Sequence, residues 1–370
     1  MSRFHDLVSP SARNLGSYIP DFSRDQSFRQ KLIIKLDSNE NPFGPSPRAI
    51  EAMRRAIEST HEYPDDDCIE LRTRLAARHN VRPEQVLVTP GSAGMLSLLC
   101  QTLLAPGRNA VTSALSFIVY GMAVRASGAR LIETPPLENG FDLAAILHAI
   151  DADTRLVFLA NPNNPTGTMI EADAIDRFLA QLPAHVVVVL DEAYYDFAAH
   201  FAALRKVEYS RSLGYVRRNA NVVVLRTFSK AHGLAGIRVG YGLGPAELLG
   251  YCARMANTYS VSSVAQVAAL AALDDQDHVD RVVANNAAQA EVLITELSKL
   301  GFCAVPTAAN FVYCDGGTDA FRFAEKLLDE GVRIRPMTAW GAPSCVRVTV
   351  GTPEQNQTFL TAVRKLIRRT

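Results

Sequence analysis

The sequence lacks any long hydrophobic segment: no apolar run in its 370 residues approaches the roughly 20 residues that span a bilayer. It also lacks a charge excess, since 38 basic residues balance 38 acidic ones, which argues against nucleic acid or an anionic membrane as a partner. No apolar region of the kind found in secretory signals follows the first six residues. We therefore expect a cytoplasmic protein that binds neither membranes nor nucleic acid.

Two further patterns are missing. The six cysteines are scattered and include no CxxC pair, so the sequence predicts neither a metal site nor a disulfide framework. The glycine-rich stretch 240–244 lacks the GxGxxG spacing of dinucleotide-binding turns. No acidic residue that could hold a ribose stands about 20 positions further on. These absences argue against a nicotinamide-dependent dehydrogenase.

What the sequence does contain is a repeated order of buried strand, polar loop and helix. Its 48% hydrophobic composition over 370 residues is enough for one large core or two domains. Short apolar runs alternate with helical stripes, which is typical of an α/β domain with a largely parallel sheet flanked by helices. The runs expected to form strands are 86–89, 110–113, 130–133, 156–160, 186–190 and 222–226.

The pattern changes near residue 275, where a long helix and then alternating strands and helices indicate a smaller α+β domain. Residues 1–35 show little periodicity and are expected to be irregular. We predict an N-terminal arm over 1–45 that packs with the small domain, a large domain over 46–274 and a small domain over 275–370. The strands expected in the small domain are 310–314, 332–335 and 346–350.

A lysine follows the strand 222–226. Burying a lysine is costly, so one at the end of a buried strand usually has a lowered pKa, a partner or a covalent role. A Schiff base to a carbonyl cofactor fits its neighbours. Thr227, Ser229 and Arg238 around Lys230 supply two hydroxyls and a fork of N–H donors, which is what a bound phosphate needs. An ordinary solvated lysine on a surface loop is the alternative.

Polar residues follow three other predicted strands, at the edge where parallel sheets bind ligands. The turn 161–167 (NPNNPTG) can fix an asparagine side chain as a donor, or can be a plain turn. Asp191 stands where a buried carboxylate tends to meet a cation, with Tyr194 three residues on, or it can cap a helix. Ser92 and Ala93 begin a helix whose backbone N–H groups form a weak anion site.

Together these residues resemble the pyridoxal 5'-phosphate (PLP) enzymes of fold type I in the class I/II aminotransferase superfamily, and most closely the histidinol-phosphate aminotransferase family. The resemblance runs from about Tyr18 to the C-terminus. It implies a large domain with a mostly parallel sheet plus a smaller α+β domain. The segments that carry it are 38–47 (with NENPFGPSP), 63–65, 161–167, 191–194, 226–240 and 347–351.

The resemblance also implies how the cofactor is held. Lys230 would carry PLP as a Schiff base and move the proton, while Asp191 would keep the pyridine nitrogen protonated. Tyr194 and Asn164 would bond the ring oxygen, and Phe117 would stack on the ring. The residues expected to hold the phosphate are Ser92, Ala93, Thr227, Ser229 and Arg238.

For substrate and partner, the resemblance implies that Arg347 clamps the α-carboxylate, with Asn39 as a second contact. Arg335 and Tyr18 would face the distal substrate group. Tyr63 would reach the phosphate in a neighbouring subunit, so a homodimer with shared active sites is expected. Core packing is the alternative for Phe117, a surface position for Tyr18 and a structural ion pair for Arg335.

The expected reaction is a ping-pong transamination between an L-amino donor and a 2-oxo acid, with histidinol phosphate and 2-oxoglutarate preferred. The sequence departs from the family at Ala93 and Gly94, where an acidic pair is usual, and at Phe117, where tyrosine is usual. Trp340 adds apolar bulk near the proposed distal-group site. An aromatic amino acid aminotransferase is therefore the main alternative, and a PLP-dependent decarboxylase of the threonine-phosphate type is a weaker one.

Overall fold

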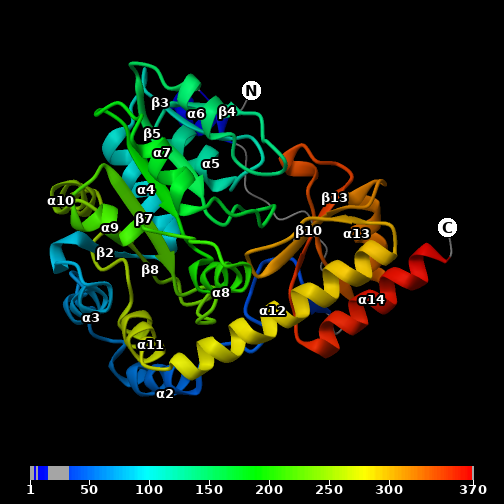
Figure 1. The fold of residues 1–370 in the computed structure, drawn as a ribbon. Helices are drawn as coiled ribbons and strands as arrows, with labels where there is room; N and C mark the ends of the chain where they lie inside the picture. The colour runs from blue at the N-terminus through cyan, green and yellow to red at the C-terminus, as the bar shows by residue number, and fades with distance from the viewer. Residues whose placement is uncertain (1–3, 6, 16–32, 369–370) are drawn as a thin grey trace.

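The computed structural model describes residues 4–5, 7–15 and 33–368, and it has two lobes, each built around its own sheet (Figure 1). Within these residues the larger sheet has seven strands in the order β2-β8-β7-β6-β5-β3-β4. Only β8 runs antiparallel to its neighbours there. The predicted α/β fold with a mostly parallel sheet is confirmed. The strands are β2 (Val86–Thr89), β3 (Asn109–Ser113), β4 (Arg130–Thr134), β5 (Thr154–Ala160), β6 (Val187–Asp191), β7 (Val222–Thr227) and β8 (Gly240–Leu243).

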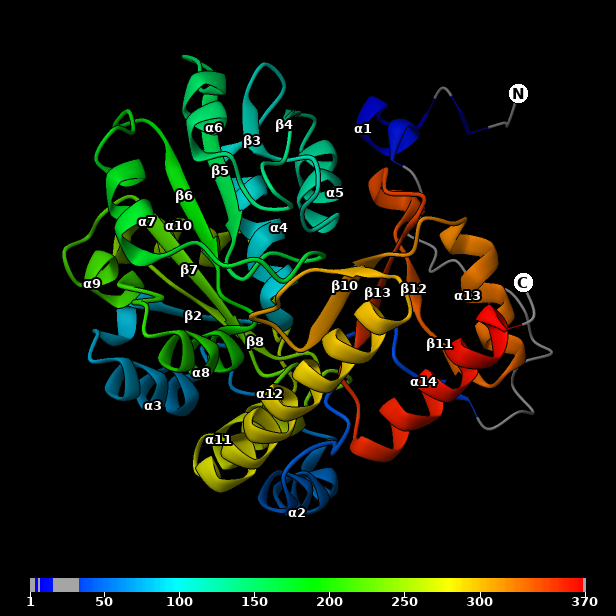
Figure 2. The same ribbon diagram turned by 45° about the vertical axis from the view of Figure 1, so that its right-hand side comes forward.

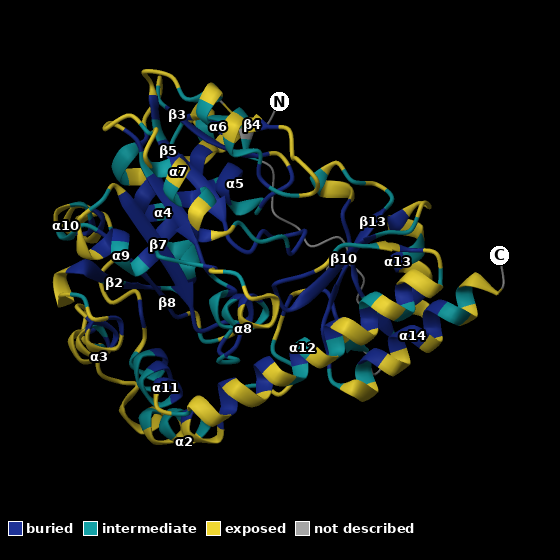
Figure 3. Ribbon diagram, in the orientation of Figure 1, coloured by how far each residue is buried: buried dark blue, intermediate teal, exposed yellow. Residues whose placement is uncertain are grey.

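The central strands of this sheet are made of branched apolar residues because both of their faces are covered. Every residue of β7 is buried, and helix α4 crosses β2, β5, β7 and β8. Figure 3 shows the buried sheet inside a shell of half-exposed helices. The helices of this lobe are α2 (Pro47–Ala56), α3 (Ile69–His79), α4 (Gly91–Leu103), α5 (Val119–Ala126), α6 (Leu143–Ala149), α7 (Ala172–Leu179), α8 (Tyr195–Arg205), α9 (Ser212–Arg217), α10 (Ala246–Arg254) and α11 (Ser263–Leu273), with 3-10 turns at Ile57–Ser59 and Pro83–Gln85.

Strand β8 was not predicted, because its sequence GYGL has no apolar run. Its glycines are required by close packing against α4. A Cβ on Gly240 would lie 2.6 Å from the backbone nitrogen of Ser92, and one on Gly242 would lie 2.9 Å from Cγ of Met95. The glycine-rich stretch therefore lets a helix lie directly on the sheet.

The smaller lobe has an antiparallel sheet with the order β12-β13-β10-β9 within the described residues. The single strand predicted over 332–335 is wrong, because two short strands on either side of the buried Ile334 pair with different partners. The first pairs with a strand from the N-terminal segment, a partner that local sequence cannot reveal. The elements are β9 (Cys303–Ala304), β10 (Phe311–Asp315), β11 (Val332–Arg333), β12 (Arg335–Pro336), β13 (Cys345–Thr349), α12 (Gln276–Lys299), α13 (Ala320–Asp329), α14 (Pro353–Ile367) and a 3-10 turn at Thr338–Trp340.

The described part of the N-terminal segment is more regular than predicted. Ser9 caps a short helix α1 (Pro10–Asn14), and β1 (Ile34–Lys35) pairs with β11. The chain then runs along the small sheet, where the backbone nitrogen of Thr349 donates to the carbonyl of Leu36 at 2.8 Å. This path brings residues 37–39 to the space between the lobes, while the domain limits at 45/46 and 274/275 stay predictions.

Helix α12 connects the two lobes (Figure 2). Its first half packs Val279, Val282 and Val283 against residues of α8. Its second half belongs to the core of the small lobe through Leu293 and Leu297. No helix within the described residues is long and apolar enough to cross a membrane.

Candidate active site

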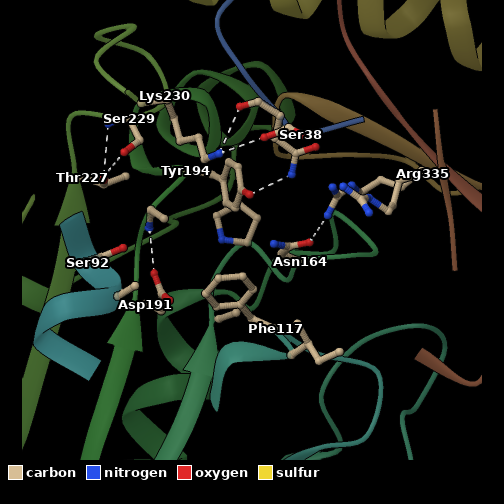
Figure 4. Close-up of a pocket in the computed structure, with 18 of the residues that line it drawn as sticks. Ser38, Ser92, Phe117, Asn164, Asp191, Tyr194, Thr227, Ser229, Lys230 and Arg335 are labelled. Carbon is tan, nitrogen blue, oxygen red and sulfur yellow. Dashed lines mark hydrogen bonds between the residues drawn. The ribbon is translucent and has the colours of Figure 1, made fainter. Parts of the chain in front are cut away.

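A cavity of about 230 Å³ lies between the two lobes, where β5, β6 and β7 end and the small sheet faces them. Figure 4 shows side chains from both lobes pointing into it. The predicted residues that line this cavity are Asn39, Ser92, Ala93, Phe117, Asn164, Asp191, Tyr194, Thr227, Ser229, Lys230, Arg238, Arg335 and Arg347, and they are joined by Ser38, Ile118 and Trp340 among others.

Lys230 extends into the cavity from the turn after β7. Its Nζ donates to the backbone carbonyls of Asn39 at 3.1 Å and Ser38 at 3.3 Å. Burial lowers the pKa of Lys230 to about 8, and the positive charges of Arg347 and Arg238 act in the same direction. A substantial fraction of this amine is therefore neutral near physiological pH, which is the state that attacks a carbonyl.

Asp191 is the last residue of β6 and is only 5% exposed. Its Oδ2 accepts from the hydroxyl of Tyr120 at 3.0 Å, and its Oδ1 accepts from the backbone nitrogen of Ala193 at 3.2 Å. Burial raises the pKa of Asp191 to about 6, and these two hydrogen bonds oppose the rise. A buried carboxylate held by neutral donors suits a cationic ligand group such as a protonated ring nitrogen.

Tyr120 is a site residue that the sequence did not reveal. It is fully buried and stacks on Phe158, with ring centroids 4.7 Å apart. The signal available was weak: one aromatic hydroxyl within the apolar helix start VYGMAV. Its role depends on a carboxylate 71 positions away.

Tyr194 lies beside the lysine, whose Nζ is 5.8 Å from the centre of the tyrosine ring. The Tyr194 hydroxyl accepts from Nδ2 of Asn39 at 2.9 Å. Burial raises the pKa of Tyr194 to about 12. The tyrosine therefore stays protonated and can donate a hydrogen bond into the cavity.

An anion cup is formed where α4 begins. The backbone amides of Ser92 and Ala93 belong to the first turn of α4, and Thr227 and Ser229 add hydroxyls that bond to each other at 3.0 Å. Gly91 is favoured here by its φ of +72°, and a Cβ on it would lie 2.6 Å from Nη2 of Arg238. The guanidinium thus closes over a helix N-terminus, a geometry that favours a phosphate.

Two buried arginines converge on the other side of the cavity. Arg335 and Arg347 are direct cross-strand partners on β12 and β13. The carbonyl of Asp37 accepts from Nη2 of Arg347 at 2.8 Å and from Nε of Arg335 at 3.4 Å. Oδ1 of Asn164 accepts from Nη1 of Arg347 at 2.6 Å. Both guanidinium groups therefore lie within reach of one anionic group.

The apolar wall of the cavity comes from both lobes. Phe117 packs edge-on against Tyr120, with ring centroids 5.5 Å apart. Trp340 belongs to the small lobe, and its Nε1 donates to the carbonyl of Ser116 in the large lobe at 2.9 Å. The tryptophan thus connects the lobes next to the ring that is predicted to stack on the cofactor.

One predicted residue, Tyr63, does not line this cavity. Tyr63 is 81% exposed and stacks on Tyr259, with ring centroids 4.5 Å apart. Tyr18 lies outside the described residues. The roles predicted for both therefore stay predictions.

The groups lining the cavity fit PLP. The guanidinium of Arg238 over the start of α4 suits its phosphate, and the buried carboxylate of Asp191 suits its ring nitrogen. The amine of Lys230 suits its aldehyde. Each of these three parts of the cofactor thus has a matching group, supplied by the end of β6 or by the connection between β7 and β8.

Comparison with known proteins gives concordant results. The family model for aminotransferases of class I and II matches residues 31–363. Histidinol-phosphate aminotransferase 2 of Pseudomonas aeruginosa is 42% identical over 99% of either chain, and histidinol-phosphate aminotransferase of Moorella thermoacetica is 41% identical over 95% of this chain and 90% of its own. The crystal structure of histidinol-phosphate aminotransferase from Sinorhizobium meliloti in complex with pyridoxal-5'-phosphate superposes with a TM-score of 0.87 and 28% identity, over 98% of both chains.

Proposed function

Because the chain belongs to the aminotransferase class I and II family and is therefore a PLP-dependent transaminase, we propose that it transfers the amino group of L-histidinol phosphate to 2-oxoglutarate. The relatives that match over nearly the whole chain act on histidinol phosphate by name. The reaction is ping-pong, with the donor and the 2-oxo acid bound in turn in the same cavity.

The observation that carries this proposal is the convergence of Arg335 and Arg347 on one point. A phosphate ester has three terminal oxygens and two negative charges, so it can accept from two guanidinium groups at once. Histidinol phosphate bears this group in place of an α-carboxylate. We propose that both arginines serve this one group, whereas the carboxylate of 2-oxoglutarate relies on Arg347.

When bound, PLP would supply an electron sink for the reaction at the substrate's α-carbon. The amine of Lys230 holds the cofactor and then takes the proton from that carbon. Asp191 keeps the ring nitrogen protonated, and Tyr194 and Asn164 donate to the ring oxygen. Phe117 packs on the ring. The residues that hold the phosphate are Ser92, Ala93, Thr227, Ser229 and Arg238.

The active assembly in this proposal is a homodimer in the cytoplasm, in which Tyr63 completes the partner's phosphate site. The high exposure of Tyr63, outside its own cavity, supports this role. Five of the six free cysteines are buried, which is compatible with a reducing compartment.

Mixing Tyr63→Ala chains with Lys230→Ala chains tests whether the two subunits share their active sites. The hybrid dimer should hold one site free of both substitutions and regain activity, and failure to regain it contradicts shared sites.

Aromatic amino acid transamination is the second candidate, because Trp340 and Phe117 offer flat apolar surfaces in the cavity. A donor panel with 2-oxoglutarate separates the two reactions. We expect the highest kcat/KM for L-histidinol phosphate, with conversion of the cofactor to its amine form. A higher value for L-tyrosine or L-phenylalanine would overturn the choice of donor. Release of CO2, with the absorbance of the cofactor returning to its starting value, would indicate a decarboxylase.

A further inference from the structure

Asp37 places a negative charge directly beside the two arginines. The residue follows β1 and is 7% exposed. Its Oδ2 lies 3.5 Å from Nη2 of Arg335, and both side chains of this ion pair are 9% exposed. Its backbone carbonyl is also the acceptor shared by Arg335 and Arg347. One residue thus contacts the guanidinium groups through its backbone and neutralises part of their charge through its side chain.

The net positive charge of this subsite is smaller than the charge of its two arginines alone. Arg335 and Arg347 contribute two positive charges and Asp37 contributes one negative charge, while Asn164 on Arg347 is neutral. These three side chains together therefore carry one net positive charge. Because both side chains of the Asp37–Arg335 ion pair are buried, the carboxylate acts on a bound anion more strongly than a surface charge does.

A ping-pong transaminase needs such a balance if its two substrates differ in charge at the same point. In the proposed function, the donor carries a phosphate ester with two charges, whereas 2-oxoglutarate carries a carboxylate with one charge there. Without a nearby negative charge, the two arginines would bind the phosphate far more tightly than the carboxylate. The donor would then also bind to the aminated form of the enzyme and block 2-oxoglutarate from it.

We propose that Asp37 is a specificity-determining residue that balances the charge of the Arg335–Arg347 subsite, so that a singly charged carboxylate and a doubly charged phosphate both bind there. When a carboxylate is bound to Arg347, Asp37 keeps its ion pair with Arg335. When a phosphate is bound, Arg335 contacts both Asp37 and the phosphate. The inference rests on the proposed function for its biological meaning, but the charge balance itself is a property of the three side chains.

The test compares Asp37→Asn, which removes the charge and keeps the shape, with the wild-type holoenzyme. Inorganic phosphate and acetate at pH 8 serve as doubly and singly charged inhibitors competing with the amino donor. We expect the inhibition constant of phosphate to fall about tenfold and that of acetate about threefold, because the electrostatic gain scales with the charge of the ligand. With L-histidinol phosphate as donor, inhibition by excess donor should become stronger by a similar factor.

Glu296→Gln is the matched control. Glu296 pairs with Arg364 and Lys299 in the small lobe and does not line the cavity. Its loss removes a carboxylate and its ion pairs but should leave both inhibition constants unchanged. Constants for Asp37→Asn that stay within about twofold of wild type, or that both rise by the same factor, would overturn the proposal, because they would indicate no role or a purely structural one.

A wild-type measurement keeps the proposal falsifiable if Asp37→Asn does not fold. With Asp37 in place, phosphate should bind no more than about tenfold tighter than acetate, and a preference of about a hundredfold would contradict the charge balance. Trp340 is the chain's single tryptophan, so its fluorescence gives both affinities without turnover. Neither probe depends on the donor, so a failure of histidinol phosphate as substrate overturns the proposed function alone.

Discussion

The hydroxyl of Tyr120 donates to the carboxylate of Asp191 across 3.0 Å, from the first turn of α5 to the end of β6. Both residues are buried, and the carboxylate raises the pKa of Tyr120 further above its usual range after the larger effect of burial. The hydrogen bond in turn opposes the rise of the Asp191 pKa. It favours the ionised form of the carboxylate, which we propose faces the cofactor ring nitrogen.

Tyr120→Phe should therefore raise the pKa of Asp191 above its present value of about 6. A larger fraction of the carboxyl group would be protonated near neutral pH, where it cannot hold a cation. We expect kcat to fall about tenfold at pH 7, the size typical of a hydrogen bond to a charged group. The acid limb of the pH–rate profile should move to higher pH.

The control for this change is Tyr215→Phe, which removes a similar hydrogen bond from a buried tyrosine to Asp176 at 2.6 Å, outside the cavity. It should leave the profile in place. An unshifted acid limb in Tyr120→Phe would show that the tyrosine only fills space.

The pKa of Lys230, lowered to about 8, predicts how the cofactor-free protein reacts with electrophiles. Only the neutral amine attacks, so its reactivity should rise with pH to half its maximum near pH 8. Reductive methylation followed by mass spectrometry gives this midpoint for Lys230 alone. In urea-unfolded protein the midpoint should return to about 10.5. Equal midpoints in the folded and unfolded chain would refute the effect of burial.

Arg335 should matter most for a phosphorylated donor. Arg335→Gln would remove one of the two guanidinium groups that we propose bind the phosphate, and we expect the KM for L-histidinol phosphate to rise roughly 10- to 100-fold. The KM for L-phenylalanine should change less than about threefold, because its carboxylate relies on Arg347. Arg347→Gln is the companion variant and should raise the KM for every donor and for 2-oxoglutarate. Equal losses for both donors in Arg335→Gln would argue against one shared phosphate subsite.

Trp340 should select donors with a flat side chain. Trp340→Leu removes an aromatic surface from the cavity, and kcat/KM should fall about tenfold for L-histidinol phosphate and aromatic donors. The value for L-alanine should stay within about threefold, since its methyl group does not reach a ring-sized surface. Trp340→Phe keeps a ring but loses the hydrogen bond to Ser116, so it separates the effect of the ring from that of the contact between the lobes. A uniform loss for all donors in Trp340→Leu would assign the residue to domain contact only.

The residues that sequence could place are those fixed by local pattern. Lys230 follows a buried strand of branched residues and Asp191 ends another, and the ends of neighbouring parallel strands meet at one edge of the sheet. The turn containing Asn164 follows β5 in the same way. Their convergence therefore follows from strand order alone.

The contacts that sequence could not supply join residues far apart in the chain. Asp37 and Arg335 are 298 positions apart, and Trp340 and Ser116 are 224 apart. An aspartate after a short strand or a tryptophan in a turn has no local feature that identifies its partner. Their roles depend on how the N-terminal segment and the small lobe close over the large sheet.

The central claim is that Lys230 is the amine that carries the cofactor. Reduction of the holoenzyme with borohydride, followed by proteolysis and mass spectrometry of the peptides, tests it directly. The account predicts one pyridoxyl label per chain, on Lys230, and no label in Lys230→Ala. A label on another lysine, or none at all, would contradict it.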